Sequence, residues 1–146
     1  MDLLIKKMAA KPESKSLIVN LLHPQGCALE ADAKITNTAC MASVHFILRP
    51  KESSVAAKKA GKSLMADESD LQCDMHIHFR SQNAFLGGYA NFWSVRQWEK
   101  EIVDRYNEEN NCQIAMGKIT VYIDAAHVYE KDYKEAKMIR QRHATE

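Results

Sequence analysis

The sequence predicts an α+β fold. Residues 42–48 and 71–79 alternate between apolar and polar side chains, which is the period of a β-strand. Residues 92–106 repeat apolar side chains with the period of a helix. The chain has 146 residues, of which 46% are hydrophobic, and this is enough for one globular core. We therefore expect one domain over residues 1–146, in which helices pack against a sheet.

The charge balance and the cysteines limit the classes of partner and the compartment. Twenty basic and nineteen acidic residues leave a formal net charge of +1, so we expect neither a nucleic acid nor a membrane as a partner. No apolar stretch reaches the roughly 20 residues of a membrane helix, and Lys6, Lys7 and Pro12 interrupt any signal-like segment. Four cysteines without a CxxC pair are typical of a reducing compartment. These observations favour a cytoplasmic protein with free thiols.

The first predicted strand lies in the amino-terminal half. Residues 17–22 form an apolar run before the turn signal of residues 23–26, and this run is compatible with a helix or a strand. The strand of residues 42–48 stops at Arg49 and Pro50, and its apolar face consists of Ala42, Val44, Phe46 and Leu48. Residues 51–70 are rich in Lys, Ser, Ala, Asp and Glu. We expect an exposed connection there, with a helical turn around residues 55–62.

The remaining elements follow in order. Residues 71–79 form a second strand that should pair with the first, and its polar face consists of Gln72, Asp74, His76 and His78. After the glycine pair at residues 87–88, a helix presents one stripe of Phe92, Val95, Glu99, Ile102 and Tyr106 and stops at residues 110–111. Residues 113–129 contain a strand in which Ile119, Val121 and Ile123 alternate with polar residues. Residues 131–140 indicate a charged terminal helix.

Residues 80–91 are the first candidate site. They place a guanidinium, a hydroxyl and carboxamides around a glycine pair where a strand ends and a helix begins, which suits an anion or a heterocycle. The alternative is a polar strand-to-helix loop with a capping Asn.

Two other places carry reactive or ligating groups. Cys40 opens a strand after the turn-like residues 36–38, where a thiol can be partly exposed and a nearby Arg can favour the thiolate; the alternative is a packed thiol. His76 and His78 share a strand face and could chelate a metal with His45 or an acidic neighbour. His127 lies at a strand end with Tyr129 on the same side, where the two side chains either bind hydroxyls or pack in the core.

Together, these places and their order along the chain resemble the motifs of a known enzyme family. Residues 80–83, Arg-Ser-Gln-Asn, followed by Phe-Leu-Gly at residues 85–87 and then Asn91, resemble without a gap an Arg-Ser-x-Asp, Leu-Gly and Asn signature. Residues 126–129, Ala-His-Val-Tyr, resemble a His-x-Tyr motif, and Cys40 resembles the nucleophile that opens the preceding strand. The family is that of thymidylate synthases and deoxycytidylate hydroxymethylases, of which this chain resembles the carboxy-terminal half.

The resemblance implies a fold and a reaction. The fold is a mixed or antiparallel sheet packed with helices, shortened and diverged, with residues 1–39 as a divergent amino-terminal segment. The reaction is attack of the Cys40 thiolate on C6 of a pyrimidine nucleotide, which makes C5 a nucleophile for a one-carbon unit from methylenetetrahydrofolate. Arg80 would favour the thiolate and hold the 5′-phosphate together with Ser81.

The resemblance also assigns the remaining site residues. His127 and Tyr129 would bind the deoxyribose 3′-hydroxyl, and Asn83 stands where the family has an Asp near the pyrimidine and the folate. Asn91 can donate to uracil O4 and accept from N3–H, whereas cytosine presents the reverse pattern, and the family's hydroxymethylases carry Asp at that position. A fixed orientation of the Asn91 amide therefore favours dUMP over dCMP.

Two partners and two functions are expected. The family dimerises by packing one sheet face against its symmetry mate, and the predicted strands carry more apolar surface than two helices can cover, so we expect a homodimer. A separate chain that supplies the missing amino-terminal half is the other expected partner. The function is either a C5 methyl- or hydroxymethyltransferase or a catalytically inactive nucleotide-binding or interaction domain of the same fold.

Overall fold

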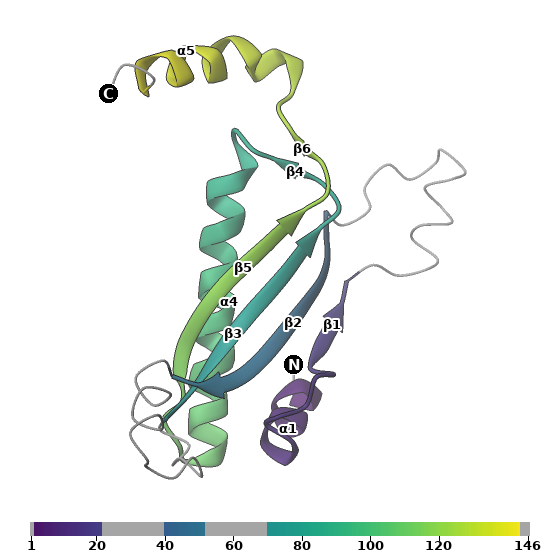
Figure 1. The fold of residues 1–146 in the computed structure, drawn as a ribbon, viewed down its shortest axis with the longest axis vertical. Helices are drawn as coiled ribbons and strands as arrows, with labels where there is room; N and C mark the ends of the chain where they lie inside the picture. Colours follow the sequence, from purple (N-terminus) through teal and green to yellow (C-terminus); the bar gives the residue numbers. More distant parts are fainter. Residues whose placement is uncertain (1, 22–39, 52–69, 144–146) are drawn as a thin grey trace, which may run out of the picture.

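The chain folds into a sheet with one long helix along a face, and its last helix lies beyond the end of the sheet (Figure 1). A computed structural model describes residues 2–21, 40–51 and 70–143. The elements in order are α1 (Asp2–Ala10), β1 (Ile18–Asn20), β2 (Met41–Pro50), β3 (Leu71–Phe79), β4 (Gln82–Asn83), α4 (Gly87–Asn110), β5 (Ala115–Ile123), β6 (Ala126–His127), the short 3-10 helix η2 (Glu130–Asp132) and α5 (Tyr133–His143). The predicted α+β class is confirmed. Most of the connection expected at residues 51–70, including its helical turn, lies outside the described residues.

The main sheet is mixed and has the strand order β1-β2-β3-β5. β2 is antiparallel to both β1 and β3, and β3 is parallel to β5. The predicted pairing of the two alternating strands is therefore confirmed, with Met41 opposite Phe79 at one end and Pro50 opposite Leu71 at the other. A parallel pair needs a crossover connection, and α4 supplies it between β3 and β5. As a result the carboxyl ends of β3 and β5 lie at the same end of the sheet (Figure 1).

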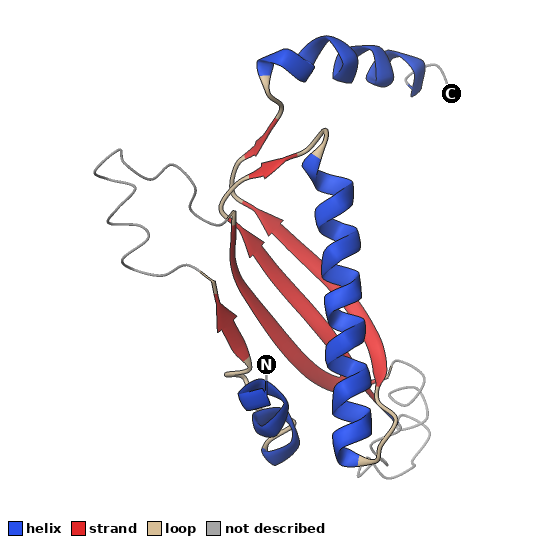
Figure 2. Ribbon diagram, turned by 180° about the vertical axis from the view of Figure 1, so that it is seen from behind, coloured by secondary structure: helices blue, strands red, loops and turns tan. Residues whose placement is uncertain are grey.

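One face of the sheet carries the core, because α4 lies along it (Figure 2). The apolar side chains of the two alternating strands point toward α4, as predicted. α1 packs on the same side and buries Ile5 and Met8, and Arg105 of α4 donates to the Asp2 carboxylate at 2.9 Å. The buried cluster consists of Ile5, Met8, Leu17, Val44, Phe46, Leu48, Cys73, Met75, Ile77, Phe79, Val95, Ile102, Val103, Tyr106 and Ile114.

α4 follows its predicted stripe with one exception. Val95, Glu99, Ile102 and Tyr106 are buried, and the helix ends where Asn111 adopts the left-handed conformation with φ 49°. The prediction for Phe92 is wrong, because its side chain is 43% exposed. α4 begins near the two-residue β4, at the end of the sheet where β3 and β5 end (Figure 1). The described helices include none that is both long and apolar enough to cross a bilayer.

The opposite face of the sheet is mostly polar. Half-buried side chains on this face come from all three long strands, and they include Ser43, His45, His76, His78 and Thr120. The expectation of an uncovered apolar sheet face is therefore wrong. The reason is that the apolar residues of β2, β3 and β5 are used against α4 and α1 on the other side.

A buried polar cluster fixes the register of β5. Arg96 of α4 forms an ion pair with the fully buried Glu99 and also donates to the Gly117 carbonyl at 3.1 Å. Glu99 in turn accepts the Gly117 N–H at 3.1 Å, and Asp74 on β3 accepts the Lys118 N–H at 2.8 Å. The pairing of β3 with β5 shifts at this point, between Cys73 and Met75.

The pKa values of the two carboxylates in this cluster, Glu99 and Asp74, are shifted in opposite directions. Burial raises the pKa of Glu99, and attraction by Arg96 offsets this only in part. Burial also acts to raise the pKa of Asp74, but hydrogen bonds from the Lys118 backbone, Gln72 and Arg49 outweigh it, and the pKa is lowered. Asp74 is thus the carboxylate that the fold stabilises in its ionised form.

Candidate functional site

The predicted site residues lie at the end of the sheet where β3 ends and β2 begins. Cys40 immediately precedes β2 and Arg80 immediately follows β3. Met41 and Phe79 are the last paired residues of the two strands, and beyond them the Arg80 N–H donates to the Cys40 carbonyl at 2.9 Å. The strand pairing therefore brings Cys40 and Arg80 side by side, although 40 positions separate them in the sequence.

Cys40 differs from the other described cysteines in its exposure. Its side chain is exposed, and the Ser81 hydroxyl donates to its sulfur at 3.8 Å. Cys73 is buried, and burial together with the charges of Glu99 and Asp74 raises its pKa to about 12. Cys112 is half-buried and donates to the Asn107 side chain at 3.5 Å. Cys27 lies outside the described residues.

A second, two-stranded sheet brings His127 to the same end. β4 is parallel to β6, with Gln82 opposite Ala126 and Asn83 opposite His127. Backbone hydrogen bonds from Gln82 to Ala125 at 3.0 Å and from Ala84 to His127 at 2.9 Å hold the pair. The rings of His127 and Tyr129 pack edge to face, with centroids 5.1 Å apart. The His-x-Tyr residues and the segment after β3 are therefore neighbours.

The Asn83 side chain holds the turn between β4 and α4. Its Oδ1 accepts the N–H groups of Phe85 at 3.0 Å and Leu86 at 3.2 Å, in the turn before α4. The alternative of a capping Asn is not found, because the N-cap residue of α4 is Leu86, without a side-chain cap hydrogen bond; Asn83 instead holds the turn that precedes the helix. Its carboxamide oxygen is thus engaged by the backbone.

Asn91 contacts Gln82, a residue for which the sequence pattern predicts no role. Its Nδ2 donates to Gln82 Oε1 at 3.0 Å. Gln82 is 1% exposed, and its Nε2 has no hydrogen-bond partner in the described part of the chain. No sequence pattern indicated this contact, because it joins a two-residue strand to the second turn of a helix.

The histidines on the polar sheet face do not form a metal site. The rings of His45 and His76 are 6.4 Å apart, and His78 forms a hydrogen bond of 2.7 Å with the Asp124 carboxylate instead. Within residues 2–21, 40–51 and 70–143, no group of three His, Cys, Asp or Glu side chains could hold a metal ion. The metal-binding alternative therefore has no ligand set in this part of the chain.

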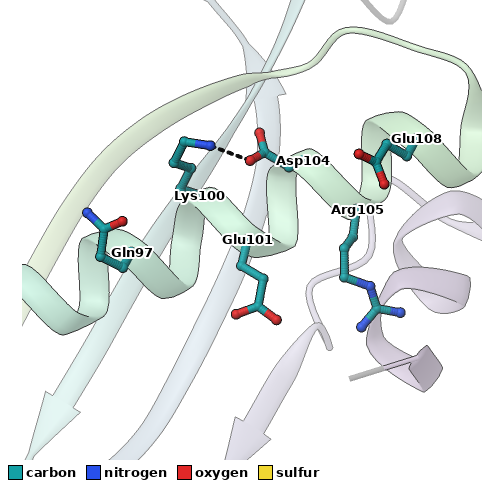
Figure 3. Close-up of a pocket in the computed structure, with 6 residues that line it drawn as sticks. All are labelled: Gln97, Lys100, Glu101, Asp104, Arg105 and Glu108. Atoms are coloured by element: carbon teal, nitrogen blue, oxygen red, sulfur yellow. Dashed lines mark hydrogen bonds and ion pairs between the residues drawn. The ribbon is translucent and has the colours of Figure 1, made fainter.

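A hollow on the outer face of α4 lies away from these residues (Figure 3). Its lining consists of Gln97, Lys100, Glu101, Asp104, Arg105 and Glu108. Both basic side chains there are engaged in ion pairs, since Lys100 pairs with Asp104, and Arg105 pairs with Asp2 and Glu109. Gln97 is ten residues beyond the start of α4, or about 15 Å along the helix. This surface is therefore separate from the candidate site.

Comparison with known proteins bears on the fold. Neither a protein-family model nor a curated protein sequence matches the chain. Among solved structures, it is similar to the thermostable thymidylate synthase A from Bacillus subtilis, with a TM-score of 0.61 and 18% sequence identity. The chain has a thymidylate synthase-like fold. The match covers 94% of this chain and 38% of that enzyme, so the thymidylate synthase-like fold is truncated relative to the enzyme, as expected.

Proposed function

We propose that the chain binds a pyrimidine deoxynucleoside monophosphate, with dUMP favoured, at the end of the sheet. The observation that carries the proposal is the meeting of Cys40, Arg80 and Ser81 at the last pair of β2 and β3, in a thymidylate synthase-like fold. The parallel pairing of β4 with β6 adds His127 and Tyr129 to the same end.

Each side chain has a chemical role in this proposal. Arg80 and Ser81 bind the 5′-phosphate, because a guanidinium and a hydroxyl are good donors to phosphate oxygens. His127 and Tyr129 bind the 3′-hydroxyl, since both can donate and accept hydrogen bonds. Asn91 pairs with the edge of the base.

The proposed chemistry is a reversible addition. The Cys40 thiolate attacks C6 of the pyrimidine, and the electron pair of the C5–C6 double bond moves through C5 toward O4. C5 then becomes the nucleophile for a one-carbon unit. The Ser81 hydroxyl, which donates to the Cys40 sulfur at 3.8 Å, would stabilise the thiolate before the attack.

The described residues do not fit a folate donor as well as they fit the nucleotide. The resemblance places an Asp where this chain has Asn83, and the Asn83 oxygen already accepts two backbone N–H groups. A one-carbon transfer from methylenetetrahydrofolate therefore rests on the resemblance alone.

One observation favours a second candidate function, an interaction domain without turnover. The first two turns of α4 expose large aromatic side chains, with Tyr89 82% exposed and Trp93 59% exposed. Exposed aromatic residues of this kind are typical of protein interfaces. A separate chain that completes the thymidylate synthase-like fold is the partner that we propose for this surface.

We also propose a homodimer through the sheet face opposite α4. That face has no described helix on it and carries side chains that are only half-exposed, among them His45, Ile47 and His76. Its polar character predicts a hydrogen-bonded interface, not the apolar one expected from the sequence. Sedimentation at micromolar concentration should give twice the mass of the chain; a monomer would contradict the dimer.

The test of the proposed function uses 5-fluoro-dUMP with methylenetetrahydrofolate. Once the one-carbon unit has joined C5, completion of the reaction requires loss of the C5 substituent as a cation; fluorine cannot leave in this way, so the adduct at C6 persists. Mass spectrometry should locate the adduct on Cys40, and the variant Cys40→Ala should lose it. Binding of dUMP without any adduct would support the domain without turnover. The absence of both would contradict the proposal.

A further inference from the structure

The carboxamides of Gln82 and Asn91 form one hydrogen-bonded pair in the turn between β4 and α4. Asn91 Nδ2 donates to Gln82 Oε1 at 3.0 Å. We propose that Gln82 is a positioning residue that orients the Asn91 amide and thereby makes the site select a 4-oxo pyrimidine over a 4-amino pyrimidine. This inference rests on the proposed function, because it assigns the base preference of the same nucleotide site.

The surroundings of Gln82 restrict its side chain to few conformations, as a positioning residue requires. It is 1% exposed, and its backbone N–H donates to the Ala125 carbonyl at 3.0 Å. The first turn of α4 passes close to its amide, since a Cβ atom at Gly87 or at Gly88 would lie 3.9 Å from Gln82 Nε2. A buried side chain between a strand pair and a helix start has few rotamers available.

The orientation of Asn91 decides which base it can read. With Nδ2 directed at Gln82, the Asn91 amide still offers Oδ1 as an acceptor and its second N–H as a donor. Uracil presents N3–H as a donor and O4 as an acceptor, which matches this pattern. Cytosine presents N3 as an acceptor and an amino group as a donor, so it requires the amide to turn by half a rotation.

Turning Asn91 alone would break the pair. Asn91 Oδ1 would then face Gln82 Oε1, and two acceptor oxygens would meet in a place without water access to Gln82. Gln82 would have to turn as well, so that its Nε2 donates to Asn91 Oδ1. The base preference therefore belongs to both amides together, and Gln82 exerts it without touching the base.

The test is the ratio of the dissociation constants of dCMP and dUMP, measured by calorimetry on the full chain. The wild type should prefer dUMP by about 5- to 150-fold. Gln82→Met removes the acceptor at similar side-chain volume and should bring this ratio close to one, because Asn91 is then free to turn. Gln82→Glu keeps an oxygen acceptor at the same reach and should retain most of the preference. Gln97→Met, at an exposed glutamine of α4, is the matched control and should leave the ratio unchanged.

The outcomes separate the inference from the function on which it rests. If the Gln82→Met variant binds both nucleotides more weakly by the same factor, Gln82 has only a structural role and the inference is wrong. An unchanged ratio in Gln82→Met, or a wild type that prefers dCMP, would overturn it too. If the wild type binds neither nucleotide, the proposed function itself fails, and the inference fails with it.

Discussion

Replacement of Gly117 by Ala tests the polar cluster that fixes β5 against β3. An ideal Cβ at this position would lie 2.1 Å from Asp74 Oδ1 and 2.6 Å from the Cys73 carbonyl oxygen. The second atom belongs to the backbone of β3, so a side-chain rotation cannot relieve both contacts. β5 must move away from β3, which lengthens the hydrogen bonds that Gly117 and Lys118 make with Glu99 and Asp74.

The expected cost follows from these contacts. Overpacking in a close-packed interior costs about 1–3 kcal/mol, and loss of a hydrogen bond adds about 0.5–1.5 kcal/mol. We therefore expect Gly117→Ala to lower the free energy of unfolding by roughly 2–4 kcal/mol, a large share of the roughly 5–15 kcal/mol of an ordinary domain. Urea denaturation followed by far-UV circular dichroism measures this difference.

Gly88→Ala is the matched control. A Cβ at Gly88 would meet its nearest atoms at 3.8, 3.9 and 4.0 Å, which are ordinary contacts. Gly88 lies in the first turn of α4, where Ala should stabilise the folded protein by about 0.5–1 kcal/mol. If both variants destabilise equally, or if Gly117→Ala unfolds at the wild-type urea concentration, the account of this cluster is wrong.

Three further predictions concern single side chains. Because burial raises the pKa of Glu99, wild-type stability should fall as the pH rises through that pKa; the urea midpoint of Glu99→Gln, which cannot ionise, should therefore rise relative to that of the wild type as the pH increases above the ordinary pKa range of a Glu. Limited alkylation followed by mass mapping should label Cys40 before Cys73 and Cys112, and preferential labelling of another thiol would contradict the nucleophile assignment. Asn83→Ala removes the oxygen that accepts two backbone N–H groups in the turn before α4 and should cost about 1 kcal/mol in unfolding free energy, whereas Asn83→Asp should keep both hydrogen bonds.

Much of the sheet and its main helix could be predicted from the sequence, because each buries one face over many residues. β2, β3 and α4 have long enough periods for the pattern to stand out, and Glu99 occupies a buried position that the stripe indicated. α1 was missed, since only Ile5 and Met8 mark its buried side. β4 and β6 contain two residues each, too few for any period.

The candidate site was predictable at the positions where the residue types and their order along the chain form a motif. Cys40, Arg80, Ser81, His127 and Tyr129 were found in this way, and the fold brings them to one end of the sheet. The contacts that orient the site were not predictable, because they depend on three-dimensional neighbours. Gln82 contacts Asn91 because β4 lies beside the start of α4. The His78–Asp124 hydrogen bond joins the ends of the parallel strands β3 and β5.

The central claim is that this end of the sheet binds a pyrimidine deoxynucleotide. Titration of the isotope-labelled chain with dUMP, followed by backbone amide chemical shifts, tests it most directly. We predict that the shifted amides belong to residues 40–43, 80–91 and 126–129, and that Arg80→Ala weakens the response. No shifts at millimolar dUMP, or shifts confined to residues 97–108 on the outer face of α4, would contradict the claim.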